Sequence, residues 1–320
     1  MTVNEIKFIE TKFAEKFHCS VLDVFGSLRR AVGPNTEKLL KIVFRHDGYI
    51  AGGFGIVVAR HAVSDKPIDW DLFEDSIVDH IGTLRINEIG KVTSLVKAGK
   101  GDIDVWFPNN EQLSAFMNDP ERLEMWNENA FTCEPTITGT ALEHIVDDRV
   151  RVQVIKQFLM PMQEQLSRFD IYNSMVGITN DTITVPENWK KLESSRTLHV
   201  HDWKTSKWTI NRLFKYMNRK GYRHVSSETA DRLAQEVVNT LEWHAEHKDE
   251  LDNMTSKNID ELNLNKLKKT AVLSMSVLKL IRKFLPSMNN DDLLLLSALL
   301  DQKTDYNYAL QEFLKRGMKE

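Results

Sequence analysis

Two aspartates at alternate positions, Asp102 and Asp104, give the strongest chemical signal in this 320-residue chain. They lie in residues 101–107, GDIDVWF, whose alternation of polar and apolar side chains predicts a β-strand. On a strand both carboxylates point to one face, and they repel each other unless a cation lies between them. Mg²⁺ binds one or two carboxylates together with phosphates, so the pair predicts a metal site suited to phosphoryl or nucleotidyl transfer. The alternative is an edge strand whose acids are solvated.

A glycine pair, Gly52 and Gly53, begins a helical run that extends to Arg60. Glycine lets the backbone approach a ligand closely, and the first turn of a helix offers unpaired N–H groups to a phosphate. We therefore expect both glycines to hold nucleotide phosphates, with Arg60 adding positive charge. A plain glycine-rich turn is the alternative.

Two other segments imitate parts of this pattern. A glycine followed by serine is the other common form of such a phosphate-binding glycine motif, and Gly26 precedes a serine. No Asp-x-Asp follows it at a useful distance, however. Asp69 and Asp71 lie closer to the glycines than Asp102 does. The apolar spacing around them predicts a helix over residues 64–82, however, and residues two apart on a helix diverge. The later pair of aspartates is therefore the first candidate.

A basic stretch rich in aromatic residues lies between Pro186 and His224, with ten Lys or Arg and three acids in a chain of net charge −4. Basic side chains bind phosphates, and aromatic rings stack on bases. On a helix predicted over residues 206–220, Arg212 and Lys215 share a face. The stretch predicts a contact with nucleic acid, and the alternative is a solvated helix face above an aromatic core.

The elements that must position these residues change in kind along the chain. The first 45 residues and residues 64–82 are predicted to be mainly helical, whereas strands are predicted over 150–158, 169–178 and 182–185. From residue 206 onward the apolar residues recur with the helical period. The order predicts an α+β domain over residues 1–200 and a helical domain over residues 201–320.

The composition is that of a packed globular protein. The chain is 42% apolar and 28% charged, which excludes a disordered polar chain. It has no apolar run of about 18 residues, so a membrane-spanning helix is not expected. The two cysteines, Cys19 and Cys133, have no metal-ligand spacing, and so few cysteines predict a reducing, cytoplasmic setting.

The ordered set of motifs resembles the polymerase-β-like nucleotidyltransferase superfamily. After the glycine pair and the Asp-x-Asp strand come VRVQVIK, SRFDIYNSMVGI, DTITVPENWKKLESSRTLHV and WTINRLFKYMNRKGY. This order is similar to that of CCA-adding enzymes and bacterial poly(A) polymerases, and the chain also resembles nucleotidyltransferase-like proteins carried by large phages. The resemblance covers roughly residues 45–222. It implies a mixed sheet with flanking helices, followed by an all-helical C-terminal domain.

The resemblance also implies an activity and a set of site residues. The activity is the transfer of a nucleoside monophosphate from an NTP to an acceptor hydroxyl, here expected on the 3′ end of a tRNA-like RNA. Mg²⁺, or Mn²⁺ in its place, would be held by Asp102 and Asp104, with Asp170 as the candidate third catalytic carboxylate. Nucleotide binding is assigned to Gly52, Gly53, Arg60, Asn173, Arg212 and Lys215.

The chain departs from the family pattern in three places. A long spacer, residues 54–101, separates the glycines from the aspartates and requires an inserted helix. In the later motif, SRFDIYNSMVGI, Phe169 separates the arginine and the aspartate that are adjacent in the family pattern. Asn173 comes one residue early in the same motif. Gln153 occupies the inward position of VRVQVIK, where an acid would serve. Two other classes of function therefore stay open: a catalytically inactive nucleotide- or RNA-binding protein on the same scaffold, and a helical interaction protein.

Overall fold

The structure is a computed structural model that describes residues 6–27, 32–64, 66–86, 92–99, 101–128, 130–135, 139–147 and 150–203, and beyond these residues 209, 212–213, 216, 220–229 and 232. The chain divides into two units, Met1–Lys191 and Leu192–Glu320, which are described separately. Most of the predicted helical domain, and Lys215, lie outside the described residues.

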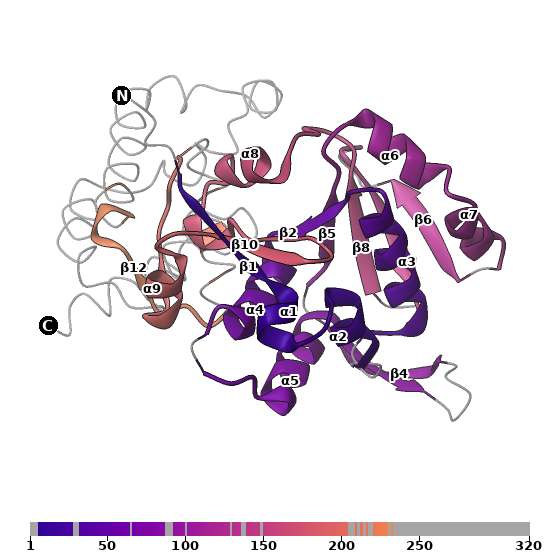
Figure 1. The fold of residues 1–320 in the computed structure, drawn as a ribbon, viewed down its shortest axis with the longest axis horizontal. Coiled ribbons are helices and arrows are strands. Elements are labelled where there is room, and N and C mark those ends of the chain that lie inside the picture. Colours follow the sequence, from indigo (N-terminus) through magenta and orange to yellow (C-terminus); the bar gives the residue numbers. More distant parts are fainter. Residues whose placement is uncertain are drawn as a thin grey trace, which may run out of the picture. The chain divides into compact units, whose positions relative to one another are not determined.

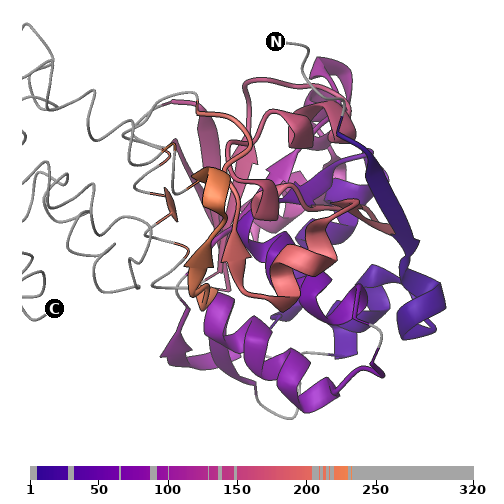
Figure 2. The ribbon, with the colours of Figure 1, turned by 90° about the vertical axis from the view of Figure 1, so that its left-hand side faces the viewer.

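An eight-stranded mixed sheet forms the first unit (Figure 1). In order across the sheet its strands are β1 (Phe8–Lys12), β10 (Thr182–Pro186), β9 (Gly177–Ile178), β2 (Tyr49–Ala51), β5 (Ile103–Trp106), β8 (Val150–Ile155), β7 (Ala141–Val146) and β6 (Phe131–Pro135). Only β5 and β8 pair in parallel; the other neighbours in this sheet are antiparallel. Figure 2 shows β1 at one edge of the sheet.

Helices flank this sheet, which confirms the predicted α+β class for the described part of the chain. They are α1 (Phe13–Phe17), α2 (Val21–Ser27), α3 (Pro34–Arg45), α4 (Gly53–Ala62), α5 (Trp70–Ile81), α6 (Asn110–Met117), α7 (Pro120–Asn127), α8 (Met162–Ser167), the 3₁₀ turn η1 (Tyr172–Ser174) and α9 (Trp189–Ser194). Helix α4 packs against β2, β5 and β10, and it is apolar around most of its circumference, as a buried helix is.

Two short sheets stand apart from the main one. Strands β3 (Gly82–Ile86) and β4 (Val92–Ala98) form an antiparallel hairpin that projects from the body of the first unit (Figure 1). In the second unit β11 (Thr197–Leu198) pairs in parallel with β12 (His224–Val225). No helix in the described part of the chain combines the length and apolarity that a membrane crossing requires.

The core confirms the alternation predicted for residues 101–107. Ile103, Val105 and Phe107 are fully buried, whereas Asp102 and Asp104 are only partly buried. Because successive side chains of a strand point to opposite faces, the two aspartates lie on the face opposite these apolar residues. Strand β5 therefore holds Asp104 near the centre of the sheet, and Asp102 lies just before the strand begins.

The prediction of helix near the N-terminus is wrong for residues 8–12. They form the edge strand β1, with Phe8 opposite Pro186 and Lys12 opposite Thr182 on β10. Pairing with this distant strand overrides the local helical spacing, whereas α1, α2 and α3 confirm the prediction of helix in the rest of this region. Phe13 and Phe17 still meet as the spacing predicted, stacked with ring centroids 4.3 Å apart.

Two other boundaries also differ from the prediction. The helix expected over residues 64–82 begins at Trp70, because Asp69 caps it by accepting the N–H of Leu72. The strand expected over residues 169–178 is confined to Gly177–Ile178. Before it the chain turns, because local hydrogen bonds to the backbone compete with strand pairing, among them that from the Ser174 hydroxyl to the Ile171 carbonyl (2.7 Å).

Candidate functional site

Asp104 and Gly52 meet at the centre of the sheet. Asp104 lies directly opposite Ala51, the last residue of β2, and the chain then turns through Gly52 into α4. A Cβ atom built on Gly52 would lie 3.5 Å from Oδ2 of Asp104, so the carboxylate faces the glycine. Gly52 has φ 81° and ψ −136°, a conformation that essentially only glycine adopts. The first glycine of the motif is therefore required by the backbone.

The start of α4, like those of α1, α3 and α8, has no hydrogen bond from its cap residue's side chain. Helices α5, α6 and α7 are capped by the side chains of Asp69, Asn109 and Asp119. The N-cap residue Gly52 has no side chain with which to cap α4, and the first turn of the helix holds no acid. The N-terminus of a helix carries partial positive charge and favours an anion. Here the nearby anion is the carboxylate of Asp104.

The segment that holds Asp170 and Asn173 runs along the same end of α4. The N–H of Gly52 donates to the carbonyl of Val176 (3.3 Å), so this amide is already paired and is not available to a phosphate. A Cβ on Gly55 would lie 3.1 Å from the Val176 side chain, so this glycine allows the close approach. The structure thus brings the later motif to the glycine element.

Both residues of the later motif are buried. Asp170 is 4% exposed, and its Oδ1 accepts the N–H of Ile171 (3.0 Å). Asn173 is fully buried, and its backbone carbonyl accepts the indole N–H of Trp189 (2.9 Å). These contacts stabilise the turn at η1. A direct contact of either side chain with a nucleotide stays a prediction.

Gln153 lies beside Asp104, as its inward position in VRVQVIK predicted. The register of β5 and β8 sets the two residues opposite each other, and Glu143 follows on β7. Nε2 of Gln153 donates to Oε2 of Glu143 (3.1 Å), and Glu143 also lies 3.9 Å from the guanidinium of Arg151. The nearest acid on this row of the sheet is therefore one strand beyond Gln153.

The described residues hold no group of three or more His, Cys, Asp or Glu side chains arranged to bind a metal ion. The candidate ligands are thus the pair Asp102 and Asp104. Two carboxylates fit Mg²⁺, which usually keeps several waters and takes further oxygens from substrate phosphates. Asp104 also stands beside the anion-favouring end of α4. A phosphate at that end is repelled by Asp104 unless a cation lies between them, so the donor set fits a metal–nucleotide complex.

His80 is a site neighbour that the sequence did not point to. It lies in the last turn of α5, is 4% exposed and bonds through Nε2 to the backbone carbonyl of Asp102 (2.8 Å). A single histidine on a helix carries no local signal of such a contact. Two glycines just before Asp102, Gly99 and Gly101, are the sequence feature that accompanies this contact of His80.

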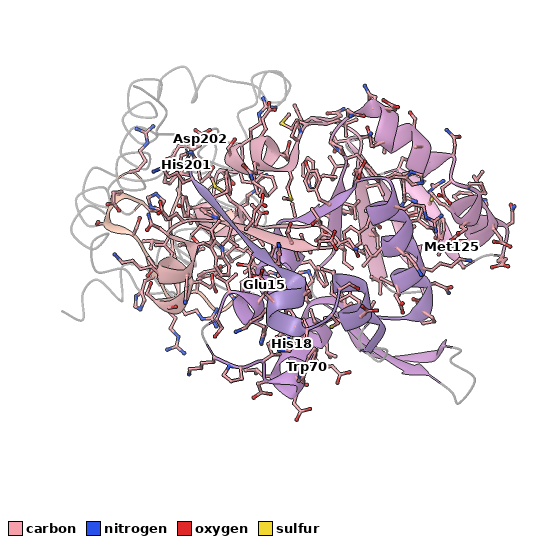
Figure 3. All side chains as sticks on the ribbon, in the orientation of Figure 1. Glu15, His18, Trp70, Met125, His201 and Asp202 are labelled. Atoms are coloured by element: carbon pink, nitrogen blue, oxygen red, sulfur yellow. The ribbon has the colours of Figure 1, made fainter. Side chains whose placement is uncertain are left out.

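Arg60 stands at the opposite end of α4 from the glycine pair. Arg60 lies in the last turn of α4, about 10 Å along the helix axis from Gly53 at 1.5 Å per residue. Arg212 is an exposed helical residue of the second unit. Figure 3 shows the side chains of the described residues; among them Trp70, 44% exposed, lies at the outer start of α5. The roles of both arginines stay predictions.

The sheet face beside the site is packed with apolar residues. Tyr49 and Ala51 of β2 form a cluster with Leu166 and Met175. The Tyr49 hydroxyl donates to the carbonyl of Met160 (3.0 Å), and burial raises the pKa of Tyr49 above its usual value. This cluster fixes β2, and with it the turn at the glycine pair, against α8.

Comparisons with known proteins find similarity in structure only. No protein-family model matches the chain, and a search of curated proteins finds no significant match. Among solved structures, the chain is similar to a CCA-adding enzyme in complex with ATP, with 12% identity, TM-score 0.45, and coverage of 98% of this chain and 70% of that one. It is also similar to the Thermotoga maritima CCA-adding enzyme complexed with tRNA, with 12% identity, TM-score 0.43 and the same coverages. A tRNA-processing enzyme in its apo form shows 14% identity, TM-score 0.39, and coverage of 88% and 73%.

Proposed function

We propose that this chain is a metal-dependent nucleotidyltransferase, which moves a nucleoside monophosphate from an NTP to an acceptor hydroxyl with release of pyrophosphate. The observation that supports it is the Asp104 carboxylate facing Gly52 at the start of α4, a helix whose first turn holds no acid. A helix end that favours phosphate and a carboxylate that favours a cation are side by side. Such a place suits a nucleotide bound together with a divalent ion.

The residues divide the work as follows. Asp102 and Asp104 hold Mg²⁺, or Mn²⁺ in its place. When bound, the ion neutralises charge on the triphosphate and favours ionisation of the acceptor hydroxyl. The first turn of α4 binds phosphate oxygens, and Asp170 supports the turn beside it. The acceptor oxygen forms a bond to the α-phosphorus as the bond to the bridging oxygen breaks, and pyrophosphate leaves.

The proposed acceptor is the 3′ end of an RNA. This part rests on the segment order shared with CCA-adding enzymes and on the basic, aromatic stretch between Pro186 and His224. In that stretch Arg212 is exposed, and the partly exposed Tyr216 lies edge to face against the buried Tyr222, with centroids 6.3 Å apart. An exposed cation and a partly exposed aromatic ring suit single-stranded nucleic acid.

A second candidate is a catalytically inactive protein that binds nucleotide on the same scaffold. The observation that favours it is Gln153 opposite Asp104, because a neutral amide does not supply the third negative charge. This protein would bind a nucleotide and metal without transferring the nucleotide.

Thermal unfolding of the full chain tests binding first. With Mg²⁺ and each NTP in turn we expect a rise in melting temperature that EDTA abolishes. A ligand at about 100 times its dissociation constant stabilises the folded state by roughly 2.7 kcal/mol. No NTP-dependent rise, or the same rise in EDTA, would contradict the metal–nucleotide site. Incorporation of labelled nucleotide then separates the enzyme from the inactive binding protein.

A further inference from the structure

The end of α5 holds the residues just before β5 at two points, both on His80. The Nε2–H of its ring donates to the carbonyl of Asp102 (2.8 Å), and its own carbonyl accepts the N–H of Gly101 (2.8 Å). Because a carbonyl oxygen only accepts, Nε2 is the protonated ring nitrogen. The second bond also satisfies one of the carbonyl groups that the end of a helix leaves without an intrahelical partner.

The chain approaches α5 here so closely that only glycine fits. A Cβ on Gly101 would lie 2.2 Å from Cε1 of His80, and a Cβ on Gly99 would lie 2.3 Å from the carbonyl carbon of Ile81. The His80 ring also lies against Phe54, in the first turn of α4, with ring centroids 5.5 Å apart. The histidine therefore touches both parts of the candidate site, the glycine element and the aspartate segment.

We infer that His80 is a positioning residue for the aspartate pair. It fixes the backbone of Asp102 against the first turn of α4, two residues before the Asp104 carboxylate that faces Gly52. This gives the inserted helix between the glycines and the aspartates a task, which is to support the metal ligands from behind. The inference rests on the proposed function, because it is metal binding that the support serves.

Three substitutions separate this role from simple packing. His80→Leu fills much of the space and removes the donor to Asp102, whereas His80→Gln keeps an N–H donor at similar reach. The matched control is His61→Leu, because His61 also joins α4 to α5, through Nε2 and the hydroxyl of Ser76 (3.2 Å), and is not among the contacts of Gly101 and Asp102.

The measurement is the Mg²⁺ concentration that gives half of the ATP-induced rise in melting temperature, with ATP at a fixed saturating concentration and the full chain in every sample. Groups that orient metal ligands typically change metal affinity by 10–100-fold when removed. We expect a rise of about tenfold or more for His80→Leu, a return to within about threefold of wild type for His80→Gln, and the wild-type value for His61→Leu.

Each contrary result is decisive. A wild-type Mg²⁺ requirement in His80→Leu, or equal defects in the Leu and Gln variants, overturns the positioning role while the proposed function stands. If the wild-type chain itself shows no Mg²⁺-dependent response to ATP, the proposed function fails and this inference fails with it. If His80→Leu does not fold, Gly101→Ala perturbs the same contact from the other side, because the new Cβ displaces the ring. A folded Gly101→Ala chain with the wild-type Mg²⁺ requirement would also overturn the inference.

Discussion

Replacing Gly52 with alanine tests whether the turn into α4 needs its unusual backbone. With φ 81° and ψ −136°, an L-residue here costs about 1–3 kcal/mol in backbone strain. Space is not the obstacle, because the new Cβ would meet Asp104 Oδ2 at 3.5 Å, an ordinary contact. We therefore expect Gly52→Ala to lose about 1–3 kcal/mol of unfolding free energy. Relief of the strain moves the start of α4 away from Asp104, so the response to Mg²⁺ and NTP should fall as well.

The matched control is Gly139→Ala, in the connection between β6 and β7. Gly139 has φ 66° and nothing within 4 Å of its built Cβ, so alanine is strained there without touching the site. Urea unfolding measures both stabilities, and melting curves with Mg²⁺ and NTP measure both responses. We expect both variants to lose stability and only Gly52→Ala to lose the response. The reasoning is refuted if Gly52→Ala matches wild type in both assays, or if Gly139→Ala loses the response equally.

Three further predictions concern single side chains. Asp104→Asn removes a like charge beside Asp102, so the chain without ligand should be no less stable, yet the gain from Mg²⁺ and NTP should vanish; an undiminished gain in melting curves rules out the pair as the metal site. Burial, and then the charge of Arg122, lower the pKa of His144 from 6.5 to about 3. Below pH 6.5 this histidine is therefore protonated in the unfolded chain and stays neutral in the folded chain. The free energy of unfolding falls as the pH falls, by roughly 2 kcal/mol between pH 7 and pH 5. His144→Gln should remove that part of the loss in urea unfolding, and an unchanged pH dependence would show the assignment to be wrong. Asp119 caps α7 and bonds to His46 (2.7 Å), so Asp119→Ala should lower the free energy of unfolding by about 2 kcal/mol at pH 7. A loss below about 0.5 kcal/mol in urea unfolding would contradict this prediction.

Local patterns predicted the elements that carry the site. The alternation in residues 101–107 predicted β5 and its buried face, and the glycine pair predicted the start of α4. Both follow from side chains close together in the sequence. Strand β1 could not be predicted in this way, because its partner β10 is far along the chain and its own residues have helical spacing. Tertiary pairing decided between two locally acceptable structures.

The parts of the site that depend on register were harder to predict. Gln153 was expected beside Asp104, but Glu143 joins the row only through the pairing of β7 with β8, and β7 was not predicted at all. His80 depends on where the end of α5 meets Gly101, and no periodicity encodes that contact. Arg60 as a phosphate contact stays a prediction, and the residue lies at the other end of α4 from the glycine pair.

A nucleotide-transfer assay tests whether the chain is a nucleotidyltransferase that acts on RNA. The wild-type chain and Asp104→Asn are incubated with Mg²⁺, total tRNA and each α-labelled NTP in turn, and label in the RNA is counted. We expect Mg²⁺-dependent labelling of RNA by the wild-type chain, and a loss of about a hundredfold or more in Asp104→Asn. Absence of labelling by a wild-type chain that binds Mg²⁺ and NTP, or equal labelling by both proteins, would contradict this expectation.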